Sequence, residues 1–213
     1  EIELNDKILL GLKYHNVYQQ NIPRKEIDES YKFMKRVVRK MNKKFGFDDT
    51  NKLQIQICGS YRREKPFSND IDVLITRLGT KASDKKTEAI YMNKFVAKLK
   101  KEWRQNDDKP FLIDDMTDKK STCKYMGFCK YKDNPPRRID IIFMPHESYN
   151  TALLYFTGSK DMCVEMRKKA KKLGYKLNEN QLYDNNKKEV IKINSEKEVF
   201  QKLDMEFIEP KYR

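Results

Sequence analysis

One stretch of the chain joins two predicted strands through a turn rich in glycine and arginine. Residues 57–75 read ICGSYRREKPFSNDIDVLI. Alternating apolar residues predict a strand from Leu53 to Cys58, and a second, more apolar strand carries Asp70 and Asp72. Side chains two residues apart on a strand point to the same face, so these two carboxylates are expected to project together. The stretch predicts a strand–turn–strand unit with an acidic pair on one face.

An acidic pair of this kind favours a bound cation. Mg²⁺ takes oxygen ligands and is commonly held by one or two carboxylates together with substrate phosphates. Gly59 and Ser60 in the preceding turn offer a backbone amide and a hydroxyl. Arg62 and Arg63 add forked donors suited to phosphate. An Asp-x-Asp can also be a solvated strand face, but the turn upstream favours a site for a metal ion and a triphosphate.

A third carboxylate stands in a later apolar strand. Asp140 lies between Ile139 and Ile141, after the chain break at Pro135-Pro136. A buried carboxylate without a partner costs several kcal/mol or takes up a proton, and a neighbouring metal ion removes that problem. Arg138 shares the face of Asp140, so we expect it to hold the carboxylate or a phosphate of a ligand.

The composition indicates a polyanionic partner. Lysine plus arginine number 46 against 32 aspartates plus glutamates in 213 residues, which gives a formal charge of +14. No apolar run approaches the roughly 20 residues that cross a bilayer, and the polar start is unlike a secretory signal. Two distant histidines make a zinc site or a histidine triad improbable. The cysteines lack Cys-x-x-Cys spacing, so we expect reduced thiols and an intracellular protein: Cys58, Cys123, Cys129 and Cys163.

The stretch that opens this section resembles the palm of the family X DNA polymerases, the nucleotidyltransferases of the DNA polymerase beta type. That palm carries Gly-Ser-x-x-Arg-Arg followed by Asp-x-Asp. Further similar stretches, in the same order as in the family, are residues 11–14, 22–24, 137–141, 154–159 and 209–211. The resemblance implies an α+β fold. It consists of a nucleotidyltransferase palm, with a mixed or antiparallel sheet and helices on one face, and a small C-terminal α/β nucleotide-binding subdomain.

The resemblance also implies three parts of the chain. They are a remnant of a helical DNA-binding domain (residues 1–26), the palm catalytic domain (27–145) and a C-terminal nucleotide- and template-binding subdomain (146–213). The helix-hairpin-helix turns and the lyase domain of the family have no counterpart in this sequence. The chain begins without methionine, so we expect a fragment.

Periodicity predicts the remaining elements. A helix that starts at Pro23 has one buried stripe and a basic outer face, and a second helix covers residues 89–103, with Trp103 packed inside. Residues 114–120 are expected to form a charged turn whose Asp114, Asp115 and Asp118 are solvated. Helices are predicted over residues 148–156, from the cap Ser159 to Leu173, and from the cap Ser195 to Leu203, with short strands between residues 175 and 193.

The resemblance assigns roles residue by residue. Asp70 and Asp72 would bridge two metal ions, and Asp140 would hold the ion at the primer end. Residues that match nucleotide-binding positions of the family are Arg24, Gly59, Ser60, Arg63, Asn69, Tyr155, Phe156 and Gly158. Residues that match DNA-binding positions are Lys124, Arg138 and Arg167. A surface cation at Arg24 and an exposed strand lysine at Lys124 remain alternatives.

The implied function is a DNA-directed DNA polymerase of the gap-filling, base-excision-repair type. It would add dNMP to a primer 3′-hydroxyl with two Mg²⁺ ions, for which Mn²⁺ can substitute, and release pyrophosphate. The implied partners are primed or gapped duplex DNA and a dNTP, with no membrane and a monomeric chain in the nucleus or at a viral replication site. Two alternatives are a catalytically silent DNA-binding palm and a nucleotidyltransferase acting on RNA.

Three positions depart from the polymerase beta pattern. Asn69 replaces a glycine, Lys160 an aspartate near the incoming base, and Cys163 an asparagine that contacts its minor-groove edge. These changes leave the acidic set intact but put fidelity, sugar choice and base-pair sensing in doubt. The Tyr155-Phe156 pair favours a template-directed enzyme over the terminal transferase branch, which has Gly-Trp there.

Overall fold

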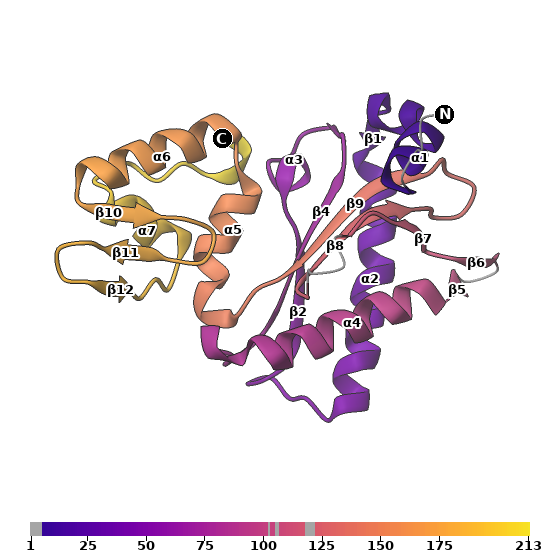
Figure 1. Ribbon diagram of the computed structural model, residues 1–213, viewed down its shortest axis with the longest axis horizontal. Helices are drawn as coiled ribbons and strands as arrows, with labels where there is room; N and C mark the ends of the chain where they lie inside the picture. The colour runs from indigo at the N-terminus through magenta and orange to yellow at the C-terminus, as the bar shows by residue number, and fades with distance from the viewer. Residues whose placement is uncertain (1–5, 102, 105–106, 118–121) are drawn as a thin grey trace.

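The computed structural model describes residues 6–101, 103–104, 107–117 and 122–213, and its centre is a five-stranded mixed sheet (Figure 1). The strand order is β2-β4-β9-β8-β7. Adjacent strands are antiparallel except β4 and β9, which run parallel. The bounds are β2 Leu53–Ile57, β4 Ile71–Arg77, β7 Leu112–Asp115, β8 Lys124–Cys129 and β9 Arg137–Phe143. The mixed sheet confirms the predicted fold class.

Helices α2 (Arg24–Phe45) and α4 (Lys85–Lys101) cover one face of this sheet. The buried stripe of α2 includes Ile27, Met34 and Met41, which recur at helical spacing and pack in one core with β4 and β9. Gly46 ends the helix because its φ of +66° is easy only for glycine. The core therefore lies between these two helices and one face of the sheet. The other face of the sheet is not covered by α2 or α4.

The opposite face is partly covered by α5 (Tyr149–Thr157). Leu74 of β4, Met144 and Ala152 of α5 form a small apolar cluster with Cys58. Helix α5 leads into a C-terminal unit with its own core, which lies beside the sheet in Figure 1. Its elements are α6 Lys160–Lys172, β10 Tyr175–Leu177, β11 Leu182–Asp184, β12 Glu189–Ile191, α7 Glu196–Lys202 and η4 Pro210–Tyr212. The predicted helices and short strands of this unit are confirmed.

The N-caps of α6 and α7 in the C-terminal unit are the residues predicted from the sequence. The Ser159 hydroxyl accepts a hydrogen bond from the Met162 amide at 3.5 Å at the start of α6. Ser195 accepts one from the Glu198 amide at 3.2 Å at the start of α7. These are the two serines predicted as N-caps.

The segment before α2 packs against the sheet. Tyr14 stacks on Phe128 of β8 with 3.8 Å between ring centroids, and its hydroxyl donates to Asp114. The Lys13 ammonium also donates to Asp114, at 2.8 Å. The elements of this segment are α1 Asp6–Lys13, η1 His15–Gln19 and β1 Ile22–Pro23, and β1 pairs with β3 Phe67–Ser68.

Two predictions from the sequence are wrong in detail. Helix α4 ends at Lys101, and Trp103 belongs to β5 (Trp103–Arg104), which pairs with β6 (Asp107–Pro110). The packing of its side chain lies outside the described residues. Asp114 and Asp115 lie in strand β7, and Asp114 is paired with Lys13 and Tyr14 instead of being solvated in a turn. Asp118 lies outside the described residues.

Three short helices complete the fold: α3 Gly59–Arg62, η2 Ala82–Asp84 and η3 His146–Ser148. All four cysteines are thiols, with Cys58 and Cys129 buried. Among the described residues, no helix has the length and apolar character needed to cross a membrane.

Candidate active site

Three carboxylates converge on the face of the sheet opposite α2 and α4. Asp72 of β4 stands directly opposite Asp140 of β9 in the parallel pairing, and Asp70 immediately precedes β4. One oxygen from each of the three lies within 4.8 Å of the others. The neighbouring residues Ile71 and Val73 point the other way, into the core. The alternation read from the sequence thus places all three acids together.

The electrostatics of this cluster are those expected of a cation-binding site. Burial raises the pKa of Asp72 to about 7, and repulsion from Asp70 and then Asp140 adds to the effect. Burial also raises the pKa of Asp140, although Arg138 opposes this. The Arg138 Nη2 donates to Asp140 Oδ1 at 2.7 Å, as the sequence predicted. A set of oxygen ligands with this much uncompensated repulsion fits a divalent metal ion.

The glycine turn lies directly against Asp72. Gly59 has a φ of +55°, and a Cβ added there would stand 2.1 Å from Asp72 Oδ2. The Cys58 amide donates to the Asp72 carbonyl oxygen at 2.8 Å. Only glycine therefore allows the start of α3, with the hydroxyl-bearing Ser60, to lie this close to the carboxylates.

Arg63 and Gly158 meet beside this turn. The Arg63 Nη1 donates to the Thr157 carbonyl oxygen at 2.6 Å, and a Cβ at Gly158 would lie 3.1 Å from that nitrogen. The Arg63 Nε is buried and has no hydrogen-bond partner among the described residues. A buried donor left unpaired costs about 1–3 kcal/mol, so the site fits an anionic ligand such as a phosphate.

Arg62 has a different role from the one predicted. Its two Nη atoms donate to the Glu196 carboxylate at 2.9 and 2.6 Å, and Nη1 also donates to Thr157 Oγ1 at 2.6 Å. Glu196 in turn accepts from Arg213 Nη1 at 2.7 Å. The expectation that Arg62 binds phosphate is therefore wrong, because its guanidinium donates hydrogen bonds to Thr157 and Glu196.

Arg24 is held beside the turn by Tyr61. Its guanidinium carbon lies 4.1 Å from the centre of the Tyr61 ring, and Nη1 donates to the Tyr61 carbonyl oxygen at 2.6 Å. The Tyr61 hydroxyl donates to Asp28 Oδ1 at 2.5 Å, and burial together with this bond raises the pKa of Tyr61 to about 12. Sequence reasoning missed Tyr61 and Asp28. The only available signal was the i, i+4 spacing of Arg24 and Asp28 on one helix.

The aromatic pair Tyr155-Phe156 lies at the end of α5. The Tyr155 and Phe156 rings stand at 90° with centroids 5.3 Å apart, and the Arg167 guanidinium lies 4.7 Å from the Tyr155 ring centre. Cys163 is half-buried, with its sulfur 3.7 Å from the Tyr155 carbonyl oxygen. Arg167 is thereby placed with the predicted nucleotide wall.

Two predicted residues are exposed. Asn69 lies immediately before Asp70, and Lys124 lies at the start of β8. Lys124 pairs with Ile142, two residues beyond Asp140 on the same face of β9. Lys124 is therefore a neighbour of the acidic cluster along the sheet, whereas contacts of Asn69 with a ligand stay a prediction.

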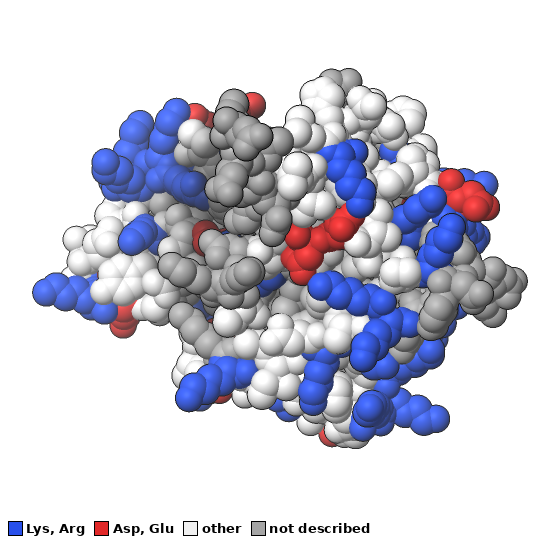
Figure 2. Space-filling model, turned by 45° about the vertical axis from the view of Figure 1, so that its right-hand side comes forward, with Lys and Arg blue, Asp and Glu red and all other residues white. Residues whose placement is uncertain are grey.

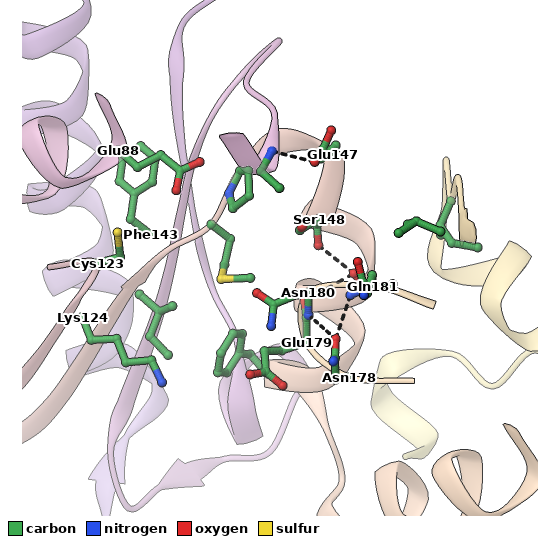
Figure 3. Close-up of a pocket in the computed structure, with 18 of the residues that line it drawn as sticks. Glu88, Cys123, Lys124, Phe143, Glu147, Ser148, Asn178, Glu179, Asn180 and Gln181 are labelled. Atoms are coloured by element: carbon green, nitrogen blue, oxygen red, sulfur yellow. Dashed lines mark hydrogen bonds between the residues drawn. The ribbon is translucent and has the colours of Figure 1, made fainter. Parts of the chain in front are cut away.

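A cavity of about 980 Å³ lies between the sheet and the C-terminal unit, and Asp70, Asp72 and Asp140 are not among the residues that line it. Figure 3 shows Lys124 and Phe143 on the sheet side, facing Asn178, Glu179 and Asn180 from the loop before β11. Phe156 also lines it. Its volume is at the upper end of the range for ligand pockets. Figure 2 shows an acidic patch with basic side chains around it on one face of the molecule.

The comparisons with known proteins agree with this geometry. The family model of the DNA polymerase beta palm matches residues 21–146, and that of the DNA polymerase beta thumb matches residues 152–213. The crystal structure of Leishmania infantum polymerase beta in a ternary P/T complex has a TM-score of 0.80 at 28% identity. The match covers 100% of this chain and 84% of the Leishmania infantum chain.

Similar sequences carry related names. DNA polymerase lambda of Arabidopsis thaliana is 28% identical over 96% of this chain, and that of Rattus norvegicus is 31% identical over 81%. DNA nucleotidylexotransferase of Gallus gallus is 28% identical over 73%. The matches span 38%, 28% and 34% of those proteins, so the chain corresponds to about a third of their length.

The fold and the site define a nucleotidyltransferase palm followed by a thumb. The chain belongs to the family X DNA polymerases.

Proposed function

We propose that this chain is the catalytic region of a template-directed DNA polymerase that adds dNMP to a primer 3′-hydroxyl and releases pyrophosphate. The observation that carries the proposal is the convergence of Asp70, Asp72 and Asp140 within 4.8 Å, directly against the Gly59 turn. Acidic ligands for cations and donors for phosphate are thus adjacent. A nucleotidyl transfer needs both in one place.

Each carboxylate has a separate task in this proposal. Asp70 and Asp72 would hold the metal ions that bind the triphosphate, and Asp140 would hold the ion at the primer end and help to take the hydroxyl proton. Two Mg²⁺ ions, or Mn²⁺ in their place, would lower the pKa of the primer hydroxyl and neutralise charge on the leaving pyrophosphate. Arg138 keeps Asp140 oriented through the 2.7 Å bond.

The nucleotide pocket is proposed at the turn between α5 and α6. Ser60 and Arg63 donate to the triphosphate, with Arg24 held against Tyr61 of the Gly59 turn. Tyr155 and Phe156 form a wall against the sugar, and the lack of a side chain at Gly158 lets Arg63 lie close to the backbone there. Asn69 is proposed to contact the nucleotide from the other side.

The DNA is proposed to lie along the exposed part of the sheet and into the cavity of about 980 Å³. Lys124 lines this cavity, and Arg138 and Arg167 flank the carboxylates and the Tyr155 wall. A net charge of +14 supports binding to a polyanion, with affinity that falls as salt rises.

The finer details stay predictions. We propose a short gap as the DNA substrate, a monomeric chain, and action in the nucleus or at a viral replication site. The division into residues 1–26, 27–145 and 146–213 is proposed on the same grounds.

Incorporation of a single nucleotide into a gapped duplex tests the proposal. With Mg²⁺, wild type should extend the primer, and Asp140→Asn should lower the rate at least 10³-fold while leaving the DNA affinity within about threefold. Asp204→Asn, at a side chain that is 92% exposed in the C-terminal unit, is the matched control. If wild type binds the duplex but extends nothing, the chain is the catalytically silent palm. Extension of an RNA primer alone favours the RNA alternative.

A further inference from the structure

Helix α2 carries a continuous basic face that the proposed catalysis does not use. Between Lys32 and Gly46 the sequence contains no acidic residue. Every exposed position from 32 to 44 is a lysine or an arginine: Lys32, Lys35, Arg39, Lys40, Lys43 and Lys44. These six residues are called the α2 basic face. Lys32, Arg39 and Lys43 lie on one side of the helix, across about 16 Å along its axis.

The α2 basic face points away from the carboxylates. The buried side of α2 packs in one core with Val73 and Ile141. These residues lie on the face of β4 and β9 opposite Asp72 and Asp140, because side chains alternate along a strand. One helix layer and the sheet therefore separate the basic face from the site, a distance of roughly 20 Å.

The chemistry of this face fits a nucleic-acid backbone better than a protein. Protein interfaces use apolar and aromatic anchors at their centre, and none of the exposed large apolar residues belongs to α2. Contacts to DNA phosphates need only cations and donors along a surface. Lys94 extends the positive charge onto α4, where its ammonium lies 4.6 Å from the Phe45 ring centre.

We propose that the α2 basic face is a second DNA-binding surface, which binds a duplex segment other than the one held at the carboxylates. A duplex resists bending over 20 Å, since its persistence length is about 500 Å, so one short duplex does not reach both faces. The second segment is another molecule or a distant part of a long DNA. This inference rests on the proposed function for the identity of the nucleic acid.

The experiment counts duplexes bound to wild type and to a neutralised variant by native mass spectrometry and sedimentation. The probes are a gapped 20-base-pair duplex and a labelled 20-base-pair duplex closed by hairpins, which has no 3′ end. The variant is Lys32→Gln, Arg39→Gln and Lys43→Gln. The control is Lys187→Gln, Lys197→Gln and Lys202→Gln, which removes three exposed cations from the C-terminal unit.

We expect wild type and the control to bind one gapped and one closed duplex. The α2 variant should lose the closed duplex, with at least a tenfold weaker affinity, and should extend the gapped primer at the wild-type rate. For the closed duplex, the slope of log K against log salt concentration should become shallower by about 2 to 3. This corresponds to about 0.9 for each cation removed.

Two results would overturn the inference. One is a single bound duplex for wild type, or a closed duplex held equally by wild type and the α2 variant. The other is that wild type binds no second duplex but binds polyglutamate, and that the α2 variant loses this binding. Such a result points to an acidic protein as the partner. Failure of the proposed function looks different, because wild type would then extend no primer whatever number of duplexes it binds.

Discussion

Asp72 sets the charge balance of the site. It faces Asp140 across the parallel pairing, touches the Gly59 turn and has a pKa of about 7. A carboxyl whose pKa is higher in the folded chain binds its proton more tightly there than in the unfolded chain. Its contribution to stability is complete below the unfolded pKa of about 3.9 and is lost as the pH rises to about 7.

Asp72→Asn should remove this pH dependence. In EDTA, the free energy of unfolding of the variant relative to wild type should rise on the order of 3 kcal/mol between pH 4 and pH 8. Urea denaturation at several pH values measures this difference, and Asp204→Asn serves as the control. Parallel curves for wild type and Asp72→Asn would contradict the assignment of the raised pKa.

Tyr61 is expected to position Arg24. Tyr61→Phe keeps the ring under the guanidinium but removes the hydrogen bond to Asp28, worth about 1 kcal/mol. The KM for dNTP should rise about fivefold with little change in kcat, because the loss concerns placement of a binding group. Steady-state kinetics on the gapped duplex measures both constants.

Tyr31→Phe is the matched control for this measurement. The Tyr31 hydroxyl donates to the Ile55 carbonyl oxygen at 2.9 Å, and its ring lies edge-on to that of Tyr61 with 6.2 Å between the ring centroids. An equal rise in KM for Tyr31→Phe and Tyr61→Phe would show a general loss of packing instead of a positioning role.

At the scale of elements, α3 and α7 are joined by buried charges. Arg62 of α3 and Arg213 both donate to Glu196 at the start of α7, and the side-chain exposures are 19%, 0% and 9%. The two arginines lower the pKa of Glu196 despite its burial. This arrangement links the palm to the thumb through the same short helix that presents Ser60.

Glu196→Gln should destabilise the chain by about 3 kcal/mol, because it leaves two arginines without their counter-charge. Urea denaturation at pH 7 measures the change. Glu165→Gln is the control, since that carboxylate is 64% exposed and pairs with Lys168 in the same helix. If the two variants are equally stable, the Glu196 ion pairs make no net contribution to the free energy of unfolding.

The sequence predicted elements better than it predicted contacts between them. Helix α2, the strands around Asp72 and Asp140, and the serine caps follow from local periodicity and hydrogen bonding. The partner of Arg62 does not, because Glu196 is distant in the chain and nothing local distinguishes a buried arginine from one that faces a ligand. The predicted end of α4 at Trp103 is wrong because the apolar spacing of the helix continues into β5.

At the scale of the whole molecule, the chain has two separate cores. One lies between α2, α4 and the sheet, and the other lies inside the thumb. Periodicity predicted the buried stripe of α2, which belongs to the first core, whereas the division of the chain into parts was implied only by the family resemblance. The cavity between them was not predicted, because its walls combine the end of β9 with loops of the thumb.

The parallel pairing of β4 with β9 has a consequence for synthesis of the chain. Asp72 and Asp140 become neighbours only after α4, β7 and β8 have been made between them. Contacts this distant in sequence form late in folding. Ribosome stalling or a frameshift in that interval leaves a fragment that has the glycine turn but only two of the three acids, and such a fragment is expected to be inert.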